Sequence, residues 1–235
     1  MDSDSTTIEW MDIDIGELPS GDGDLIAAPG HSHVYKYKER FAVKIACQEK
    51  ELQMMQNAGT CSITPRGRVL QSGEQVGIIM DLGQAVDVMS LDVVAKKELI
   101  RELISLVTAL HDKGLIHGDI KLANLLIAPN GGLRLCDFEG CQYESLAEAP
   151  EEPTLNWMSP TRLNNLNLPI SKADDFYALG LTIWEIFAGK IPFSGLDESE
   201  VEKRIEAGET VDLLEIEELD VRGIIEEYLK LGSLI

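Results

Sequence analysis

The chain carries a compact group of polar residues between Ile116 and Leu126, where one His, one Asp, one Lys and one Asn stand among apolar neighbours. Asp119 is able to accept a proton from a hydroxyl group, and Lys121 to neutralise charge on a phosphoryl group in transfer. Asn124 offers an amide oxygen to Mg²⁺. These residue types at this spacing predict a catalytic loop for phosphoryl transfer.

The same stretch resembles the catalytic loop of the protein kinase superfamily. The family signature is H-R-D-L-x-x-x-N, and here Gly118 stands at the Arg position and Ile120 in place of Leu. The resemblance implies that Asp119 is the proton acceptor and that His117 is a packed core residue rather than a base. Lys121, two positions after Asp119, is similar to the Ser/Thr branch of the family rather than the Tyr branch.

A single Lys interrupts the apolar run Phe41–Ala46, which is predicted to be a strand. Lys44 could be a plain edge-strand charge, but the run resembles the family's V-A-I-K strand. In the family this Lys holds nucleotide phosphates and pairs with a Glu on the next helix, which is predicted here over residues 48–58. Glu51 fits the family's register, and Glu49 is the alternative partner.

The resemblance implies a nucleotide site whose phosphate loop departs from the family pattern. A hairpin is predicted over residues 25–37. Aligning Val34 with the Val of G-x-G-x-x-G-x-V puts Ala27, Pro29 and Ser32 at the three glycine positions. Because Pro29 also removes a backbone donor, a weakened phosphate cradle is expected.

The stretch from Met80 to Leu82 resembles the hinge that joins the two lobes of a kinase. On this register Met80 is the gatekeeper side chain, and the backbone of Asp81 and Leu82 faces the adenine edge. The alternative is a plain exit from a strand into a loop. The resemblance further implies that Val34, Ala42 and Leu126 line the ATP site.

A second metal-binding motif is implied at Asp137-Phe138-Glu139, which resembles the family's D-F-G. Asp137 would bind Mg²⁺ together with Asn124, and Phe138 would pack inward. Glu139 stands in place of the family's Gly, which makes large backbone rotations less easy. A third carboxylate near the metals is left open.

The sequence departs from the family where an activation segment is normally switched by phosphorylation. Gly118 replaces the Arg that receives the phosphate, so we predict activity without that modification. Trp157–Thr161 looks like A-P-E with Thr161 in place of Glu. The terminal Arg that pairs with that Glu in the family is missing as well.

Two further residues are implied to support the catalytic loop. Thr154 lies where the family keeps a Thr that braces the catalytic Asp and Lys; the alternative is an exposed loop residue. Asp175 fits the family's Asp that is buried against backbone amides of the catalytic loop; the alternative is a charge at a helix N-terminus.

The apolar spacing predicts the elements that must position these residues. Helices are expected over residues 91–113, 174–187, 198–206 and 219–231, and strands over 69–71 and 76–80. The resemblance implies an α+β, bilobal protein-kinase-like fold: a small antiparallel sheet with one helix in the N-lobe, and a larger, mainly helical C-lobe. We expect an acidic tail without packed structure at 1–24, an N-lobe at 25–82, and a C-lobe at 83–235 that is short at its C-terminal end. Docking of part of the tail onto the small lobe is left open.

The formal net charge of −21 over 235 residues argues against docking on nucleic acid or on anionic membranes. It favours protein substrates that are basic near the acceptor hydroxyl, as does the acidic stretch 141–156.

A signal peptide and a long apolar span are both lacking, so we expect a cytoplasmic or nuclear protein. The four cysteines show no C-x-x-C pair and are predicted to be free thiols. The oligomeric state stays open.

We expect a compact, ATP- and Mg²⁺-dependent protein Ser/Thr kinase that resembles compact fungal kinases. The missing glycines and Glu139 leave open a pseudokinase scaffold that binds nucleotide weakly or not at all. The H-G-D sequence leaves open a small-molecule phosphotransferase of the aminoglycoside or choline kinase type. Lys121, the stretch 157–161 and the helix of Asp175 argue against this last hypothesis.

Overall fold

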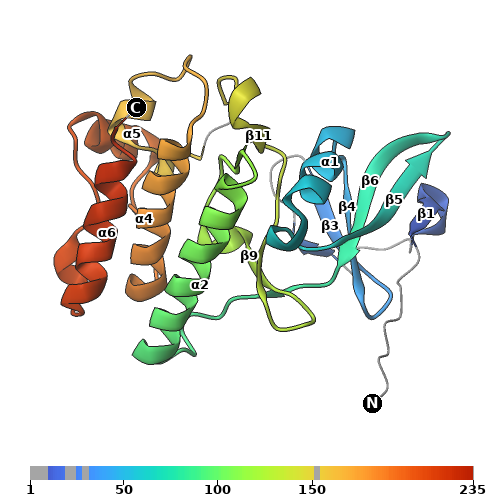
Figure 1. The fold of residues 1–235 in the computed structure, drawn as a ribbon, viewed down its shortest axis with the longest axis horizontal. Helices are drawn as coiled ribbons and strands as arrows, with labels where there is room; N and C mark the ends of the chain where they lie inside the picture. Colours follow the sequence, from blue (N-terminus) through green and yellow to red (C-terminus); the bar gives the residue numbers. More distant parts are fainter. Residues whose placement is uncertain (1–9, 19–24, 28–31, 151–153, 235) are drawn as a thin grey trace.

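The computed structural model describes residues 10–18, 25–27, 32–150 and 154–234. A β-sheet with one packed helix lies at one end of the long axis, and a helical layer lies at the other end (Figure 1). The predicted α+β, bilobal architecture is confirmed.

The N-lobe is built on a six-stranded sheet in the order β1-β5-β6-β4-β3-β2. Its strands are β1 (Met11–Asp14), β2 (Leu25–Ala27), β3 (His33–Tyr37), β4 (Phe41–Ile45), β5 (Pro65–Gln71) and β6 (Glu74–Asp81). Every pair is antiparallel except β1, which runs parallel to β5. The strands predicted at 69–71 and 76–80 are present and extend further, because they pair along their length across a tight turn.

Part of the stretch predicted as an acidic tail is a strand of this sheet. Met11 and Ile13 alternate with Asp12 and Asp14, and the two apolar side chains pack on a cluster above the sheet. Arg68 on β5 donates to both carboxylate oxygens of Asp12. Docking of part of this stretch onto the small lobe, which the sequence left open, is therefore observed for residues 11–18, because this alternation matters more than like-charge repulsion. Residues 1–9 and 19–24 lie outside the described part.

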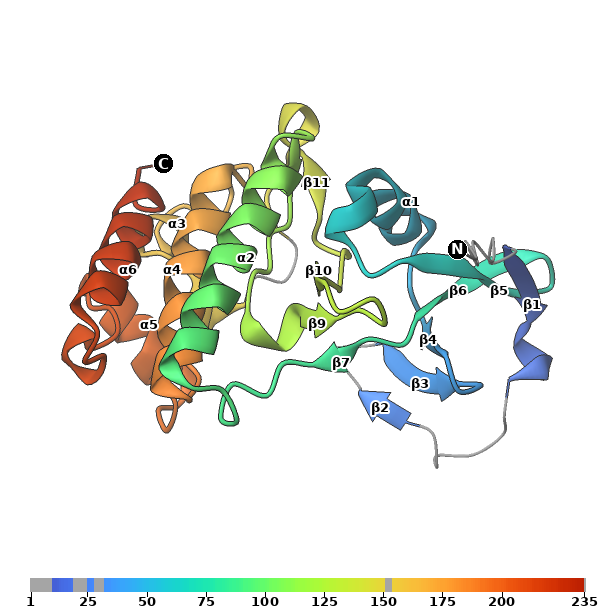
Figure 2. The same cartoon turned by 60° about the horizontal axis from the view of Figure 1, so that its bottom comes forward.

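One helix, α1 (Glu49–Ala58), packs against the sheet (Figure 2). Gln48 is its N-cap residue, so it begins one position later than the sequence predicts. Leu52, Met54 and Met55 are buried at helical spacing, which anchors the helix to the core.

Two small sheets hold the chain at the junction of the lobes. The first has the order β10-β9-β7, from β7 (Gln84–Ala85), β9 (Leu125–Ile127) and β10 (Leu133–Leu135). The second pairs β8 (Leu115–Ile116) with β11 (Gln142–Tyr143). Because β8 precedes residues 117–124 and β9 follows them, the catalytic loop is fixed at both ends.

The C-lobe is a layer of helices in which α4 lies between α2 and α6 (Figures 1 and 2). These helices are α2 (Val93–His111), α3 (Pro160–Leu163), α4 (Lys172–Ala188), α5 (Glu198–Glu206) and α6 (Leu219–Leu231). The bounds of α5 and α6 match the predicted ranges. A capping box of Ser171 and Asp174 begins α4, and most of its residues from Asp175 to Ile186 are buried. This helix is the centre of the lobe.

The structure also bears on the state of the cysteines and on membrane-spanning helices. All four cysteines are free. Among the described residues, no helix combines the length and the apolar character needed to cross a membrane.

Candidate active site

The catalytic loop follows β8 and ends in a short 3-10 turn, Leu122–Asn124. Gly118 has a φ of +80°, a left-handed backbone conformation that favours glycine. This explains why a glycine stands at the family's Arg position. His117 and Phe138 are fully buried and pack edge to face, as predicted. The ring of His117 also lies 3.1 Å from the carbonyl oxygen of Cys136.

Asp119 is held by three side chains. Lys121 Nζ lies 2.7 Å from its Oδ2, and the hydroxyl of Thr154 donates to its Oδ1 at 2.7 Å. The amide nitrogen of Asn124 donates to Oδ2 at 2.8 Å. Burial alone would raise the pKa of Asp119, but the charge of Lys121 and the bonds from Lys121 and Thr154 outweigh it and lower that pKa. Asp119 is therefore an oriented, ionised acceptor, and the bracing role predicted for Thr154 has its contacts.

Lys44 joins the two lobes at the site. Its Nζ lies 2.8 Å from Glu51 Oε1 and 2.7 Å from Asp137 Oδ1, and Glu139 is further away at 3.8 Å. The side chains of Lys44 and Glu51 are 4% and 2% exposed. Burial would lower the pKa of Lys44, yet Glu51 and Asp137 together raise it. The prediction of Glu51 as partner is confirmed, because Glu49 is exposed.

Two residues supply the oxygens predicted for Mg²⁺. Asp137 has a φ of +62°, which turns its side chain back toward Lys44. Asn124 donates its amide nitrogen to the carbonyl and carboxylate of Asp119, which points its amide oxygen the other way. Among the described residues, no group of three or more His, Cys, Asp or Glu is arranged to hold a metal. Mg²⁺ is usually bound by one or two carboxylates plus substrate phosphates and water, so the Asp137 and Asn124 oxygens fit this ion.

The side chains predicted to line the adenine region all belong to, or pack against, the main apolar core. Ala42 on β4 pairs with Met80 on β6, and both are buried. Val34, Leu82 and Leu126 pack against the same cluster. The central part of the predicted phosphate loop, residues 28–31 with Pro29, lies outside the described residues; Ala27 ends β2, and Ser32 precedes β3.

The hinge prediction needs a correction. The amide N–H of Asp81 donates to the carbonyl oxygen of Thr64, and the amide N–H of Leu82 donates to that of Arg40, both at 2.9 Å. Neither N–H is therefore available to an adenine edge. The side chain of Asp81 is also taken, because Arg66 donates to both of its carboxylate oxygens at 2.7 Å.

Asp175 supports the catalytic loop as predicted. Its carboxylate is fully buried and accepts hydrogen bonds from the backbone N–H groups of His117 and Gly118, both at 2.8 Å. His111 Nε2 lies 2.8 Å from the same carboxylate. Sequence reasoning missed His111, although a His in the last turn of a predicted helix just before the loop was a usable signal.

Two more residues of α4 contact the loop and were also missed. The hydroxyl of Thr182 lies 3.2 Å from the carbonyl oxygen of Ile120. The backbone N–H of Leu122 donates to Glu185 Oε2 at 3.3 Å. Burial raises the pKa of Glu185 to about 7. A lone acid within an apolar helix was the signal in the sequence.

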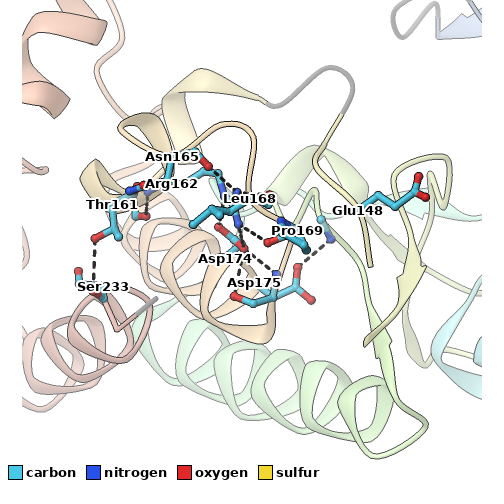
Figure 3. Close-up of polar contacts among 12 residues, drawn as sticks. Glu148, Thr161, Arg162, Asn165, Leu168, Pro169, Asp174, Asp175 and Ser233 are labelled. Carbon is cyan, nitrogen blue, oxygen red and sulfur yellow. Dashed lines mark hydrogen bonds and ion pairs between the residues drawn. The ribbon is translucent and has the colours of Figure 1, made fainter. Parts of the chain in front are cut away.

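The fourth residue that sequence reasoning missed is Arg162. Its side chain is buried and donates to Asp174, whereas the adjacent Thr161 is 3.3 Å from the carbonyl oxygen of Ser233. Both contacts are visible in Figure 3. The family's acidic residue at Thr161 is absent, but its neighbour carries a buried ion pair of its own.

A small hollow lies beside Asp119. Its wall is formed by the catalytic loop, by the segment that begins at Thr154 and by α4; among the lining residues are Gly118, Asp119, Thr154, Trp157, Arg162 and Asp174.

Comparison with known proteins agrees with this geometry. Residues 31–228 match the family model described as "Protein kinase domain". The chain is 33% identical over 136 residues to "Mitogen-activated protein kinase kinase kinase 3" of Arabidopsis thaliana, covering 56% of this chain and 24% of that protein. It is 42% identical over 87 residues to "MAP kinase kinase MKK1/SSP32" of Saccharomyces cerevisiae, covering 36% of this chain and 16% of that protein. The chain therefore spans about a quarter or less of the length of these relatives.

Among solved structures, the "Structure of the Cydia pomonella Granulovirus kinase, PK-1" resembles this fold with a TM-score of 0.62. The two share 21% sequence identity, and the match covers 85% of this chain and 83% of that one. At this level of identity the likeness concerns the fold alone.

Proposed function

The chain belongs to the protein kinase domain family, and from this premise we propose that it transfers the terminal phosphoryl group of ATP to Ser or Thr hydroxyls of protein substrates. The observation that carries the proposal is a set of contacts around two charged residues. Asn124 donates to the carboxylate of Asp119, and the buried Lys44 pairs with both Glu51 and Asp137.

Asp119 and its neighbours act on the acceptor hydroxyl. The lowered pKa of Asp119 keeps it ionised at neutral pH, ready to orient the hydroxyl and accept its proton. Thr154 and Lys121 fix the two carboxylate oxygens. The ammonium of Lys121 also places positive charge beside the phosphoryl group in transfer, where negative charge develops.

Lys44, Glu51, Asp137 and Asn124 serve the nucleotide. Glu51 is buried and orients Lys44 toward the phosphates. When bound, Mg²⁺ would neutralise phosphate charge, and Asp137 and Asn124 would hold it. Ala42, Met80 and Leu126 are the apolar side chains that would contact an adenine ring.

The proposed substrates are proteins with Lys or Arg near the acceptor hydroxyl. Glu144, Glu148, Glu151 and Glu152 lie in the segment before Thr154, which has no Lys or Arg from Cys141 to Asn156. Such complementary charge favours encounter with basic sequences. A cytoplasmic or nuclear location stays a prediction.

The test is transfer of radiolabelled phosphate from ATP to a basic protein and to the chain itself. We compare wild type with Asp119→Asn and Lys44→Met, and use Lys36→Met as a matched control, because Lys36 lies in the same sheet in an exposed pair with Glu39. Transfer that is lost in the first two variants and kept in the third supports the proposal. Absence of transfer by wild type with Mg²⁺ or Mn²⁺ would favour a scaffold, which calorimetry of nucleotide binding would then characterise.

A further inference from the structure

All three guanidinium nitrogens of the buried Arg162 side chain donate hydrogen bonds. It is 3% exposed. Its Nε and one terminal nitrogen donate to the two carboxylate oxygens of Asp174 at 2.7 and 2.8 Å. The remaining bonds go to the carbonyl oxygens of Asn165, Leu168 and Pro169, at 2.7 to 3.0 Å (Figure 3). A planar guanidinium matches a carboxylate in this bidentate way, and Lys does not.

Asp174 is fixed in turn by the start of α4. The backbone N–H of Ser171 donates to its Oδ2 at 2.8 Å, within the capping box of that helix. The backbone N–H of Ile170 donates to the carbonyl oxygen of Glu148 at 2.9 Å. The first turn of α4 therefore holds the segment before Thr154 as well as the segment after it.

Adjacent residues of α4 hold two segments that line the hollow beside Asp119. Asp174 binds Arg162, which lies at the far end of the segment that begins at Thr154. Asp175 binds the backbone of the catalytic loop at His117 and Gly118. One turn of one buried helix therefore contacts both segments.

The resemblance leads one to expect an acid at Thr161 and a distant Arg near the chain's end, and this chain has neither. In this chain the basic residue lies on α3 and the acidic residue on α4, the opposite order along the sequence from the family's Glu and Arg. The two residues are only twelve positions apart. We propose that Arg162 is a positioning residue for the protein acceptor, holding residues 155–163 by its pair with Asp174 at the distance from Asp119 that productive binding requires. This inference rests on the proposed kinase function.

The pair lies outside the nucleotide machinery. Lys44 lies on β4, Glu51 lies on α1, and Asp137 lies two positions after β10. Among the described contacts, none of the three shares a bond with Arg162 or Asp174. Loss of the pair should therefore weaken use of the protein acceptor and leave use of ATP intact.

The experiment compares Asp174→Asn and Arg162→Lys with wild type. Asn keeps the shape of Asp174, and its side-chain oxygen can still accept the hydrogen bond from Ser171. Lys keeps the positive charge of Arg162 but cannot form the bidentate contact of a guanidinium group. Arg204→Lys is the matched control, because Arg204 forms an exposed pair with Glu200 on α5. For each protein we measure KM and kcat for a basic protein substrate, KM for ATP, ATP hydrolysis without acceptor, and the melting temperature.

We expect KM for the protein to rise, or kcat/KM to fall, about tenfold or more in both variants, with KM for ATP and basal ATP hydrolysis within twofold of wild type. Arg204→Lys should match wild type in every measurement. Unchanged KM for the protein would overturn the inference, and so would parallel loss of transfer and basal hydrolysis, which marks a general structural role. If wild type itself neither transfers phosphate nor hydrolyses ATP, the proposed function fails instead.

Discussion

Lys44 and Asp137 lie 93 positions apart in the chain, yet Nζ of the first is 2.7 Å from Oδ1 of the second. Glu51 contacts the same ammonium group from the other side. One buried cation therefore joins a strand of the N-lobe, the helix packed on it and Asp137 of the C-lobe. This contact gives the first prediction.

Replacing Lys44 by Met should lower kcat/KM for phosphate transfer by at least about 100-fold, because a positioned charge at the phosphates is lost. The melting temperature should also fall, since Glu51 is left buried without its cation. Lys36→Met, an exposed change in the same sheet, should leave both values unchanged. A Lys44→Met enzyme with near-normal kcat/KM would contradict the assigned role.

Removing the hydroxyl of Thr154 should raise the pKa of Asp119, because that hydrogen bond helps to lower it. The acidic limb of the kcat/KM profile should then shift to higher pH in Thr154→Ala. The rate at neutral pH should fall about tenfold, the cost of one hydrogen bond to a charged group. Thr154→Ser keeps the hydroxyl and should keep the wild-type profile; an unshifted limb in Thr154→Ala would refute the bracing role.

Glu185 should make stability depend on pH. Burial raises its pKa from 4.5 to about 7, so the folded protein binds a proton that the unfolded chain releases near pH 4.5. The resulting stabilisation is full below pH 4.5 and is lost as pH rises through about 7. Relative to wild type, Glu185→Gln should therefore gain about 1 to 3 kcal/mol of unfolding free energy between pH 5 and pH 8. Urea unfolding at several pH values measures this, and a difference independent of pH would exclude the effect.

Transfer should not require phosphorylation of the segment between Asp137 and Leu163. Gly118 has no side chain to bind a phosphate, and its φ of +80° disfavours replacement by Arg. An ion pair that needs no phosphate also holds the segment, because Lys172 Nζ lies 2.7 Å from Glu144 Oε2. Phosphatase-treated protein, shown by mass spectrometry to carry no phosphate, should transfer at the untreated rate. A rate that collapses after treatment and returns on rephosphorylation would overturn this expectation.

Gly67 should be needed for the strand at the chain's beginning. A Cβ atom there would lie 1.9 Å from the carbonyl oxygen of Met11, so β1 would have to move. Gly67→Ala should cost roughly 1 to 3 kcal/mol of unfolding free energy and speed hydrogen exchange across β1 and β5. Gly223→Ala, in α6 with open space around it, should be neutral or stabilising by up to about 1 kcal/mol. Equal effects of the two changes would show that β1 does not pack as described.

Much of the fold could be predicted where the signal was local. The bounds of α5 and α6 follow from apolar spacing at one face of each helix. The pairing of β1 with β5 could not be predicted, because it joins strands more than fifty positions apart in parallel. The acidic composition of β1 suggested a solvated segment. The alternation of Met11 and Ile13 with two acids was a weaker signal, and it was the one that indicated a strand.

The site divides in the same way. Asp119, Lys121 and Asn124 belong to one short motif, so the sequence could predict that they lie together, as they do. The bonds of the Asp81 and Leu82 amides could not be predicted, because their acceptors, Thr64 and Arg40, lie in other parts of the chain. Arg162 was missed for a similar reason: its partners are spread over a loop of no recognisable pattern.

The β1 strand also changes how the molecule meets its copies. An uncovered β5 would present a row of unpaired backbone groups, which is a template for joining another chain. With β1 in place, the outermost strand on this side has only four residues, with Asp12 and Asp14 exposed along it. A strand this short offers a second copy only a short template for edge-to-edge pairing.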